Sequence, residues 1–243
     1  MKMEMYMVKV KYFSKQQIEV NAGRLLADFG KNFGVVEHPP IPVEEILETH
    51  LKLTMEFDNL RSRLGFPDVL GALWAPDRLV GIDESLDPSA FPQKEGRYRY
   101  TVGHEIGHWE QHRHYFLTDP NQGEMFPELR KEPSVICRVS QAKEPIEWQA
   151  DYFSACLLMP SGMVIAAWRQ QTIPSPYSTN SGTHEYWRSM NVRDPDALPS
   201  PDLAAAQLAR RFQVSKQAMT IRLEELNLLP QATGPLFSDQ VSG

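Results

Sequence analysis

The stretch TVGHEIGHWEQHRH, Thr101–His114, holds four of the seven histidines of the chain. On an α-helix His104 and His108 lie one turn apart on the same face, so both imidazoles can bind one ion at about 2.0–2.1 Å. Glu105 follows the first histidine and can reach a water molecule on that ion. In this arrangement the metal acidifies the water and the glutamate accepts its proton. We therefore predict a metal site with His104 and His108 as ligands and Glu105 as general base.

The other two histidines of the stretch do not fit the same ion. His112 is eight residues past His104, a rise of about 12 Å along a helix. His114 has the spacing at which some zinc enzymes bring back a third histidine, but they turn the chain at a glycine. Gln111 stands at that position here. The helix should continue and carry His114 about 15 Å from His104, so we expect neither His112 nor His114 to be a ligand.

The histidine pattern is short and also fits a surface helix, so it does not establish a metal site without a further ligand elsewhere in the sequence. The segment EWQAD, Glu147–Asp151, places two carboxylates on one face of a later helix, with Ala150 beside them to permit close packing. Glu147 can complete a site of two histidines and one glutamate that keeps a position open for water. Asp151 can accept the second ring N–H of a ligating histidine and so fix its orientation.

The alternative interpretation of Glu147 and Asp151 is a solvated acidic face. The neighbouring residues argue against it, because a carboxylate in apolar surroundings normally needs a metal or a charged partner. These neighbours are Tyr152, Phe153, Leu157 and Leu158.

Composition excludes several classes of protein. With 243 residues, 42% of them hydrophobic, the chain can bury an ordinary core. A net charge of −6 gives no general reason to bind nucleic acid or an anionic membrane. Two cysteines are too few for a disulfide framework, which favours a reducing cytosol. No apolar run approaches the roughly 20 residues of a spanning helix, so we expect a cytoplasmic protein without membrane insertion.

Periodicity predicts helices at residues 16–34, in HPPIPVEEILETHLKL (38–53), from about Tyr98 onward and in PIEWQADYFSACLLMP (145–160). A β-hairpin fits VLGALWAPDRLVGIDES, residues 69–85. A long proline-containing excursion separates residues 116 and 145. We divide the chain into a metal-binding domain at 1–171, a proline-rich linker or arm at 172–201, and a helical segment with a tail at 202–243.

The segment LARRFQVSKQAMTIRLEELNLL, residues 208–229, predicts a helix-turn-helix with Ser215 as N-cap of its second helix. In a DNA reader Lys216, Gln217 and Thr220 would meet the base edges. Residues 200–243 carry four basic and four acidic side chains, however. We therefore favour packing on the first domain, or docking of a protein, over direct DNA binding.

RYRYTVGHEIGHWEQH (97–112) and EWQADYFSACLLMP (147–160) together resemble the ImmA/IrrE family of intracellular metallopeptidases. Weaker matches at PPIPVEEILETHLKL and at LAAAQLARRFQVSKQAMTIRLEELNLL follow the order of the family. The resemblance implies an α+β, mostly helical, zincin-like domain with a small sheet. It also assigns His104, His108 and Glu147 as ligands of Zn²⁺ and Glu105 as base. Nitrogen and oxygen donors also accept other divalent ions such as Mn²⁺.

The resemblance implies a substrate class as well, because family members cut or inactivate helix-turn-helix repressors. We expect a zinc endopeptidase that cleaves such a regulatory protein. The segment RLVGIDES (78–85) is either a sheet edge to which the substrate pairs or a buried structural strand. One alternative is a DNA-binding transcriptional regulator with a non-proteolytic sensor domain of metallopeptidase fold. A structural zinc protein is disfavoured, because such sites generally use four protein ligands. The side chains that by type could stabilise an oxyanion are Tyr98, Tyr100, His112, His114, Tyr115 and Tyr152.

Overall fold

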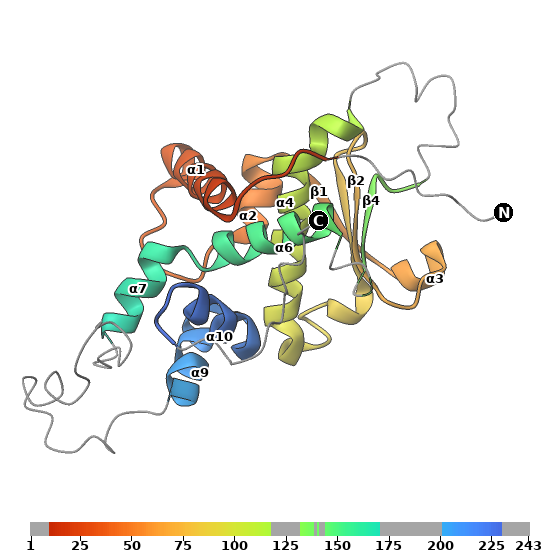
Figure 1. Cartoon of the computed structure of the whole chain (residues 1–243). Coiled ribbons are helices and arrows are strands. Elements are labelled where there is room, and N and C mark those ends of the chain that lie inside the picture. Colours follow the sequence, from red (N-terminus) through yellow and green to blue (C-terminus); the bar gives the residue numbers. More distant parts are fainter. Residues whose placement is uncertain (1–9, 118–131, 139, 141–143, 171–200, 230–243) are drawn as a thin grey trace, which may run out of the picture.

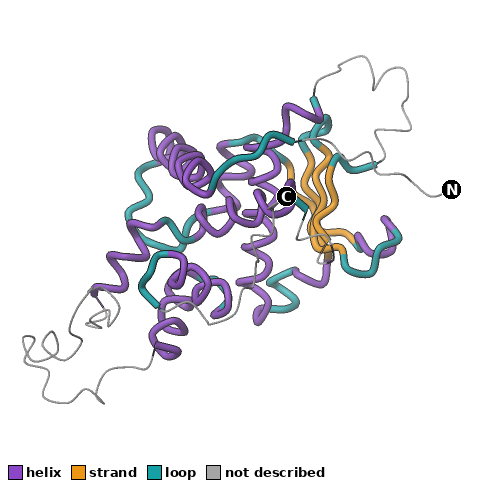
Figure 2. Tube along the Cα trace, viewed as in Figure 1, coloured by secondary structure: helices purple, strands orange, loops and turns teal. Residues whose placement is uncertain are grey.

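The computed structural model describes residues 10–117, 132–138, 140, 144–170 and 201–229. Helices pack mainly on one face of a small mixed sheet (Figures 1 and 2), so the predicted α+β, mostly helical fold class is confirmed. Helix α4 (Glu95–Phe116) lies between the sheet and α6 (Pro145–Leu158), and α3 (Leu60–Leu64) lies on the opposite side of the sheet. The long central helix is therefore covered on both sides.

The sheet has the strand order β1-β3-β2-β4. Its strands are β1 (Thr54–Asp58), β2 (Val69–Trp74), β3 (Leu79–Asp83) and β4 (Val135–Arg138). Strands β2 and β3 form the predicted antiparallel hairpin, whereas β1 pairs in parallel with β3 and β4 pairs antiparallel with β2. The expectation that residues 78–85 supply a free sheet edge is wrong, because β1 and β2 occupy both sides of β3.

The first two predicted helices are present. Helix α1 (Lys15–Phe33) begins with a capping box at Ser14 and ends at Gly34, and it buries Ile18, Ala22, Leu25 and Phe29. Helix α2 (Val43–Glu45) continues into a wider π-helical turn, η1 (Ile46–His50). The remaining short elements are η2 (Glu84–Leu86), η3 (Pro92–Lys94) and α7 (Ser161–Gln170).

Two glycines allow α4 and α6 to approach closely. A Cβ atom at Gly107 would lie 3.0 Å from the carbonyl oxygen and 3.1 Å from the Cα of Ala150, and one at Gly103 would lie 2.5 Å from Ser154 Oγ. Because Gly103 and Gly107 are one turn apart, they form a smooth stripe along which α6 packs. This contact brings the first turn of α6 beside the histidines of α4.

The C-terminal helices α9 (Pro201–Phe212) and α10 (Lys216–Glu225) join the same hydrophobic core as α1, α4 and α6. Ser215 caps α10 as predicted. Arg222, only 1% exposed, donates to the carbonyl of Met159 at 3.1 Å and to Glu19 at 2.7 Å. The predicted linker and tail fall almost wholly outside the described residues, and the three-part division stays a prediction.

In the described ranges, no single helix combines the length and apolar composition of a membrane span. Helices α6 and α7 meet that criterion only as a pair, across a bend of 47°.

Candidate metal centre

Helices α4 and α6 bring three predicted ligands together. Glu147 Oε2 lies 3.2 Å from His104 Nε2, and its Oε1 lies 3.4 Å from His108 Nε2. The two Nε2 atoms are 2.9 Å apart. A tetrahedral ion with bonds of about 2.0–2.2 Å keeps its ligand atoms roughly 3.3–3.6 Å apart. The three side chains therefore fit one metal ion with shifts of a few tenths of an ångström.

Asp151 fixes the tautomer of His104. Its Oδ1 lies 2.8 Å from His104 Nδ1 and, as a carboxylate, can only accept a hydrogen bond. His104 therefore carries its proton on Nδ1 and directs the lone pair of Nε2 at His108 and Glu147. Such a lone pair beside a carboxylate requires a cation between them, and a metal ion satisfies this requirement.

His112 lies behind His108 in the same way. The two Nδ1 atoms are 3.2 Å apart, so one ring must donate to the other. When His108 directs a bare Nε2 at a metal, its Nδ1–H donates to His112. Burial, helped by the charge of His108, lowers the pKa of His112 to about 3, so His112 is neutral and can accept. The helix continues unbroken, so His112 contacts the ring of His108 and not that of His104, and His114 is exposed.

Glu105 is buried beside this group. Its two carboxylate oxygens have no hydrogen-bond partner among the described residues. Burial raises its pKa to about 8, against the opposing charge of His104. The carboxylate fits here because its neighbour on β2 is a glycine. A Cβ atom at Gly71 would lie 2.5 Å from Glu105 Oε1. An unpaired buried carboxylate next to two imidazoles again indicates that a cation belongs in the site.

The pKa shifts of the ligands agree with a site built for positive charge. Burial alone would lower the pKa of His104, but Cys137, Asp151 and Glu147 raise it well above its ordinary value. Burial would raise the pKa of Glu147, yet His108 and His104 hold it far below its usual range. The pKa of His108 is lowered, mainly by burial. In the metal-free protein, a proton on His104 therefore supplies the positive charge that a bound metal ion would otherwise supply.

Comparison with known proteins agrees with the sequence resemblance. Residues 138–224 match the family model Peptidase_M78, described as the IrrE N-terminal-like domain. This part of the chain is therefore similar to the IrrE N-terminal-like domain of the Peptidase_M78 family. The predicted resemblance and the zincin-like fold class are thereby confirmed. The matched range includes Glu147, Asp151 and most of α10, and it begins after the histidine motif.

Among solved structures, a Mycobacterium tuberculosis transcriptional regulator resembles the chain with a TM-score of 0.45 and 13% sequence identity. The similarity covers 92% of this chain and 60% of that protein, so the chain spans well under two thirds of its length. No curated protein matches the chain.

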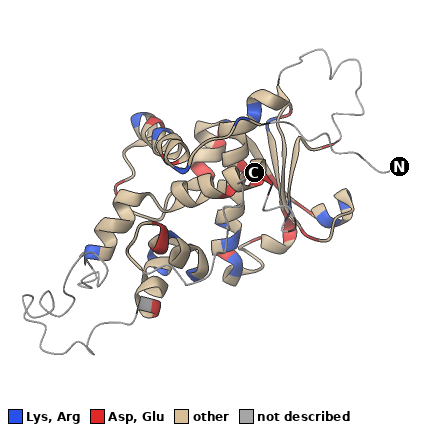
Figure 3. Cartoon of the chain, viewed as in Figure 1, with Lys and Arg blue, Asp and Glu red and all other residues tan. Residues whose placement is uncertain are grey.

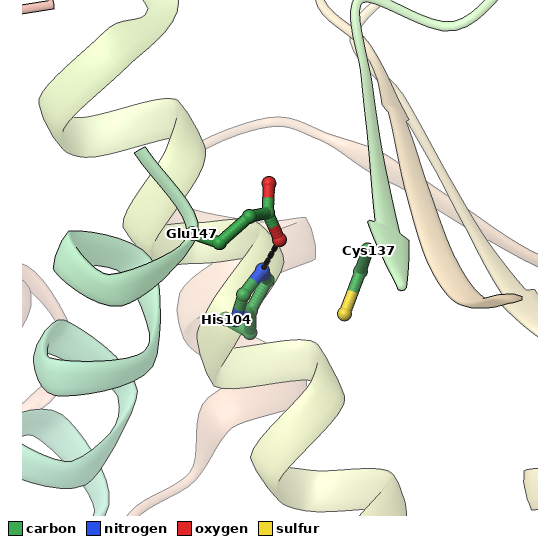
Figure 4. A group of neighbouring side chains, drawn as sticks. All are labelled: His104, Cys137 and Glu147. Carbon is green, nitrogen blue, oxygen red and sulfur yellow. Dashed lines mark ion pairs between the residues drawn. The ribbon is translucent and has the colours of Figure 1, made fainter. Parts of the chain in front are cut away.

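Cys137, which the sequence did not indicate as a candidate ligand, lies beside His104 and Glu147. Three donor atoms, one each from His104, Cys137 and Glu147, lie within 4.8 Å of one another, and all three residues are buried. Figure 4 shows Cys137 extending from β4 across the gap from His104 and Glu147. Burial raises the pKa of the Cys137 thiol to about 11, although His104 opposes this shift. The sequence signal that could have indicated this strand is the pair of β-branched residues, Val135 and Ile136, before Cys137.

One cavity is lined by the candidate ligands, and a second cavity shares two lining residues with it. The first, of about 200 Å³, is lined by the donors His104, Cys137 and Glu147, and the second, of about 470 Å³, lies between the start of α4 and α10. Arg97 and Tyr100 line both cavities.

Among the six side chains considered as oxyanion stabilisers, Tyr100 is the one that lines the cavity beside the donors, and its hydroxyl donates to the carbonyl of Asp151 at 2.8 Å. Tyr98 Oη lies 3.7 Å from Met55 Sδ, Tyr115 Oη accepts from the Lys11 amide, and Tyr152 stacks on Trp148.

Proposed function

We propose that this protein is a zinc-dependent endopeptidase with His104, His108 and Glu147 as ligands and Glu105 as general base. The observation that carries the proposal is the convergence of three side chains, whose nitrogen and oxygen atoms approach one another at 2.9, 3.2 and 3.4 Å beside an unpaired buried carboxylate. The Peptidase_M78 domain supports this assignment. The donor set would also accept Mn²⁺, so zinc is part of the proposal.

The residues around the ligands have separate tasks. A bound metal would supply Lewis-acid charge that acidifies water and polarises a peptide carbonyl. Asp151 orients His104, and His112 orients His108. Glu105 accepts a proton from the attacking water and later returns it to the leaving amine. Without metal, burial raises the pKa of Glu105 to about 8, and the positive charge of a bound ion would lower this pKa and leave a carboxylate that can accept the proton.

We propose a regulatory protein, specifically a helix-turn-helix repressor, as the substrate, following the resemblance to the ImmA/IrrE family. The cavity of about 470 Å³ supports a protein substrate, because it shares Arg97 and Tyr100 with the site and extends toward α10. Helix α10 would then form one wall of the substrate path. A cytosolic location completes the proposal and agrees with two free, buried cysteines.

Direct DNA binding by α9 and α10, as in a regulator with a non-proteolytic sensor domain, is less well supported. Met219, Arg222 and Leu223 of α10 are buried. Of the side chains that would read bases, Lys216 pairs with Asp202 and Gln217 lines the larger cavity. Figure 3 shows acidic as well as basic residues on these two helices. A DNA backbone would therefore meet mixed charge.

The test is to incubate the full-length protein with the helix-turn-helix repressor encoded beside it, with and without a chelator. We expect discrete fragments from the wild type, none with chelator, and none from Glu105→Gln, although that variant should still bind the metal. Glu110→Gln is the matched control, because Glu110 lies on the same helix and pairs with Arg113 at the surface. Cleavage by Glu105→Gln, or a chelator-insensitive reaction, would refute the mechanism.

A gel-shift assay at physiological salt covers the alternative function. Specific DNA binding by a protein that cuts nothing would favour a sensor-type regulator over an endopeptidase.

A further inference from the structure

Strand β4 places a thiol at the metal site. It occupies the sheet edge next to β2, and Cys137 pairs in register with Gly71. Gly71 is the residue against which the carboxylate of Glu105 lies. The register of β4 therefore fixes Cys137 beside the group that would activate water.

The surroundings of Cys137 differ from those of an ordinary core cysteine. The second cysteine, Cys156, belongs to the main hydrophobic cluster, and Ile136 belongs to a smaller one, but Cys137 belongs to neither. Its side chain lines the cavity that His104 and Glu147 also line. The unpaired oxygens of Glu105 provide an independent sign that this space is meant to hold a cation.

We propose that Cys137 is a fourth ligand of the metal ion and that β4 thereby latches the site in a resting state. The inference rests on the proposed metal site and adds a mode of regulation to it. Cys137 binds as a thiolate and releases one proton to solvent. The sulfur then takes the coordination position that the reacting water needs, so cleavage requires Cys137 to withdraw.

The distances permit this bond without rebuilding the site. A tetrahedral zinc ion with a Zn–S bond of about 2.3 Å and Zn–N bonds of about 2.05 Å separates sulfur and nitrogen by about 3.6 Å. The donor atoms of Cys137, His104 and Glu147 are already within 4.8 Å of one another. The donor atoms are therefore at most about 1.2 Å farther apart than such an ion requires, and a movement of this size by Cys137 would form the bond.

The pairing of β4 explains how the latch can open. Asp68 anchors one end of the strand, because its carboxylate accepts from Arg138 Nε and from the Ser140 amide, both at 3.0 Å. The ladder between β2 and β4 has a register shift between Val69 and Gly71, which interrupts regular pairing near the thiol. A peptide strand that replaces β4 beside β2 would withdraw Cys137 and free the fourth position.

The test uses Co²⁺ bound to the full chain, because a thiolate ligand adds a near-ultraviolet charge-transfer band to the visible bands of cobalt. We expect this band in the wild type and in the control Cys156→Ala. Cys137→Ser and Cys137→Ala should lose it, keep the visible bands, and bind metal at least about tenfold more weakly. X-ray absorption of zinc-loaded wild type needs no variant, and it should show one sulfur at about 2.3 Å.

The spectra test whether Cys137 binds the metal, and the cleavage rates test whether it blocks the reaction. A cobalt-bound wild type without the band, or a zinc shell of nitrogen and oxygen alone, overturns the thiolate ligand and leaves the proposed peptidase standing. Faster repressor cleavage by Cys137→Ala than by the wild type supports the latch, and equal or slower cleavage overturns it. If the band is present but neither protein cuts any repressor, the ligand stands and the proposed function falls.

Discussion

Replacing Gly107 by alanine adds a methyl group to the closest contact between α4 and α6. The new Cβ would lie 3.0 and 3.1 Å from backbone atoms of Ala150, whereas ordinary contacts begin at 3.4 Å, so the helices must separate by about 0.4 Å. Overpacking of this kind costs about 1–3 kcal/mol, and the gain in helix propensity of about 1 kcal/mol offsets only part of it. We expect a net loss of about 1 kcal/mol in the free energy of unfolding.

The same displacement acts on the metal site, because Glu147 is one turn before Ala150 and His108 follows Gly107. We expect the affinity for zinc to fall by about tenfold, as when the support of a ligand is removed. Urea unfolding and competition with a chromophoric chelator measure the two effects.

Gly23→Ala is the matched control, because it also lies within a helix and its Cβ would meet nothing within 4 Å. It should raise stability by about 0.5–1 kcal/mol and leave zinc affinity unchanged. The packing argument fails if Gly107→Ala behaves like Gly23→Ala in both measurements.

Three further predictions concern other parts of the molecule. Gly71→Ala should abolish cleavage yet retain metal, because its methyl group would collide with the Glu105 carboxylate; activity near that of the wild type would contradict the placement of the base. Arg222→Ala should cost about 3 kcal/mol in urea unfolding by leaving Glu19 without its buried partner, against less than about 1 kcal/mol for the exposed Lys15→Ala. Because Arg222 lowers the pKa of Glu19 from 4.5 despite burial, that contribution should be complete above about pH 4.5 and be lost as the pH falls through the lowered pKa; acid-insensitive stability would argue against it. Metal binding at pH 7 should release one more proton from wild type than from Glu105→Gln, as calorimetry in two buffers can show, because the pKa of Glu105 is raised to about 8 without metal. For the same reason the stability of the metal-free protein should fall between about pH 4.5 and 8, where the folded state keeps a proton that the unfolded chain has lost.

The parts of the site that depend on one helix could be predicted from the sequence. The spacing of His104 and His108 determines that they share a face of a helix, and the same applies to Glu147 and Asp151. Their meeting across α4 and α6 depends on the glycines at 103 and 107. Ala150 was predicted to permit close packing, but the glycines that face α6 from the histidine helix were not predicted to do so.

The role of His112 was missed although its signal is local. His112 is one turn past His108, the same spacing that pairs His104 with His108. This spacing predicts a contact between the two rings, and the structure shows it as a distance of 3.2 Å between their Nδ1 atoms.

Strand β4 and Cys137 could not be found by periodicity. The strand has four residues and follows a proline-containing excursion, and its pairing partner β2 is more than sixty residues away. Sheet pairing at such a distance is not encoded in local patterns. The same limitation explains the wrong sheet edge, because the parallel pairing of β1 with β3 was not anticipated.

The most direct test of the central claim is anomalous diffraction at the zinc absorption edge from crystals of the zinc-loaded protein. We predict one strong peak between His104 Nε2, His108 Nε2 and the carboxylate of Glu147, at about 2.0–2.2 Å from each. A map without a peak at this position, or with its zinc bound elsewhere in the molecule, would contradict the proposed metal centre.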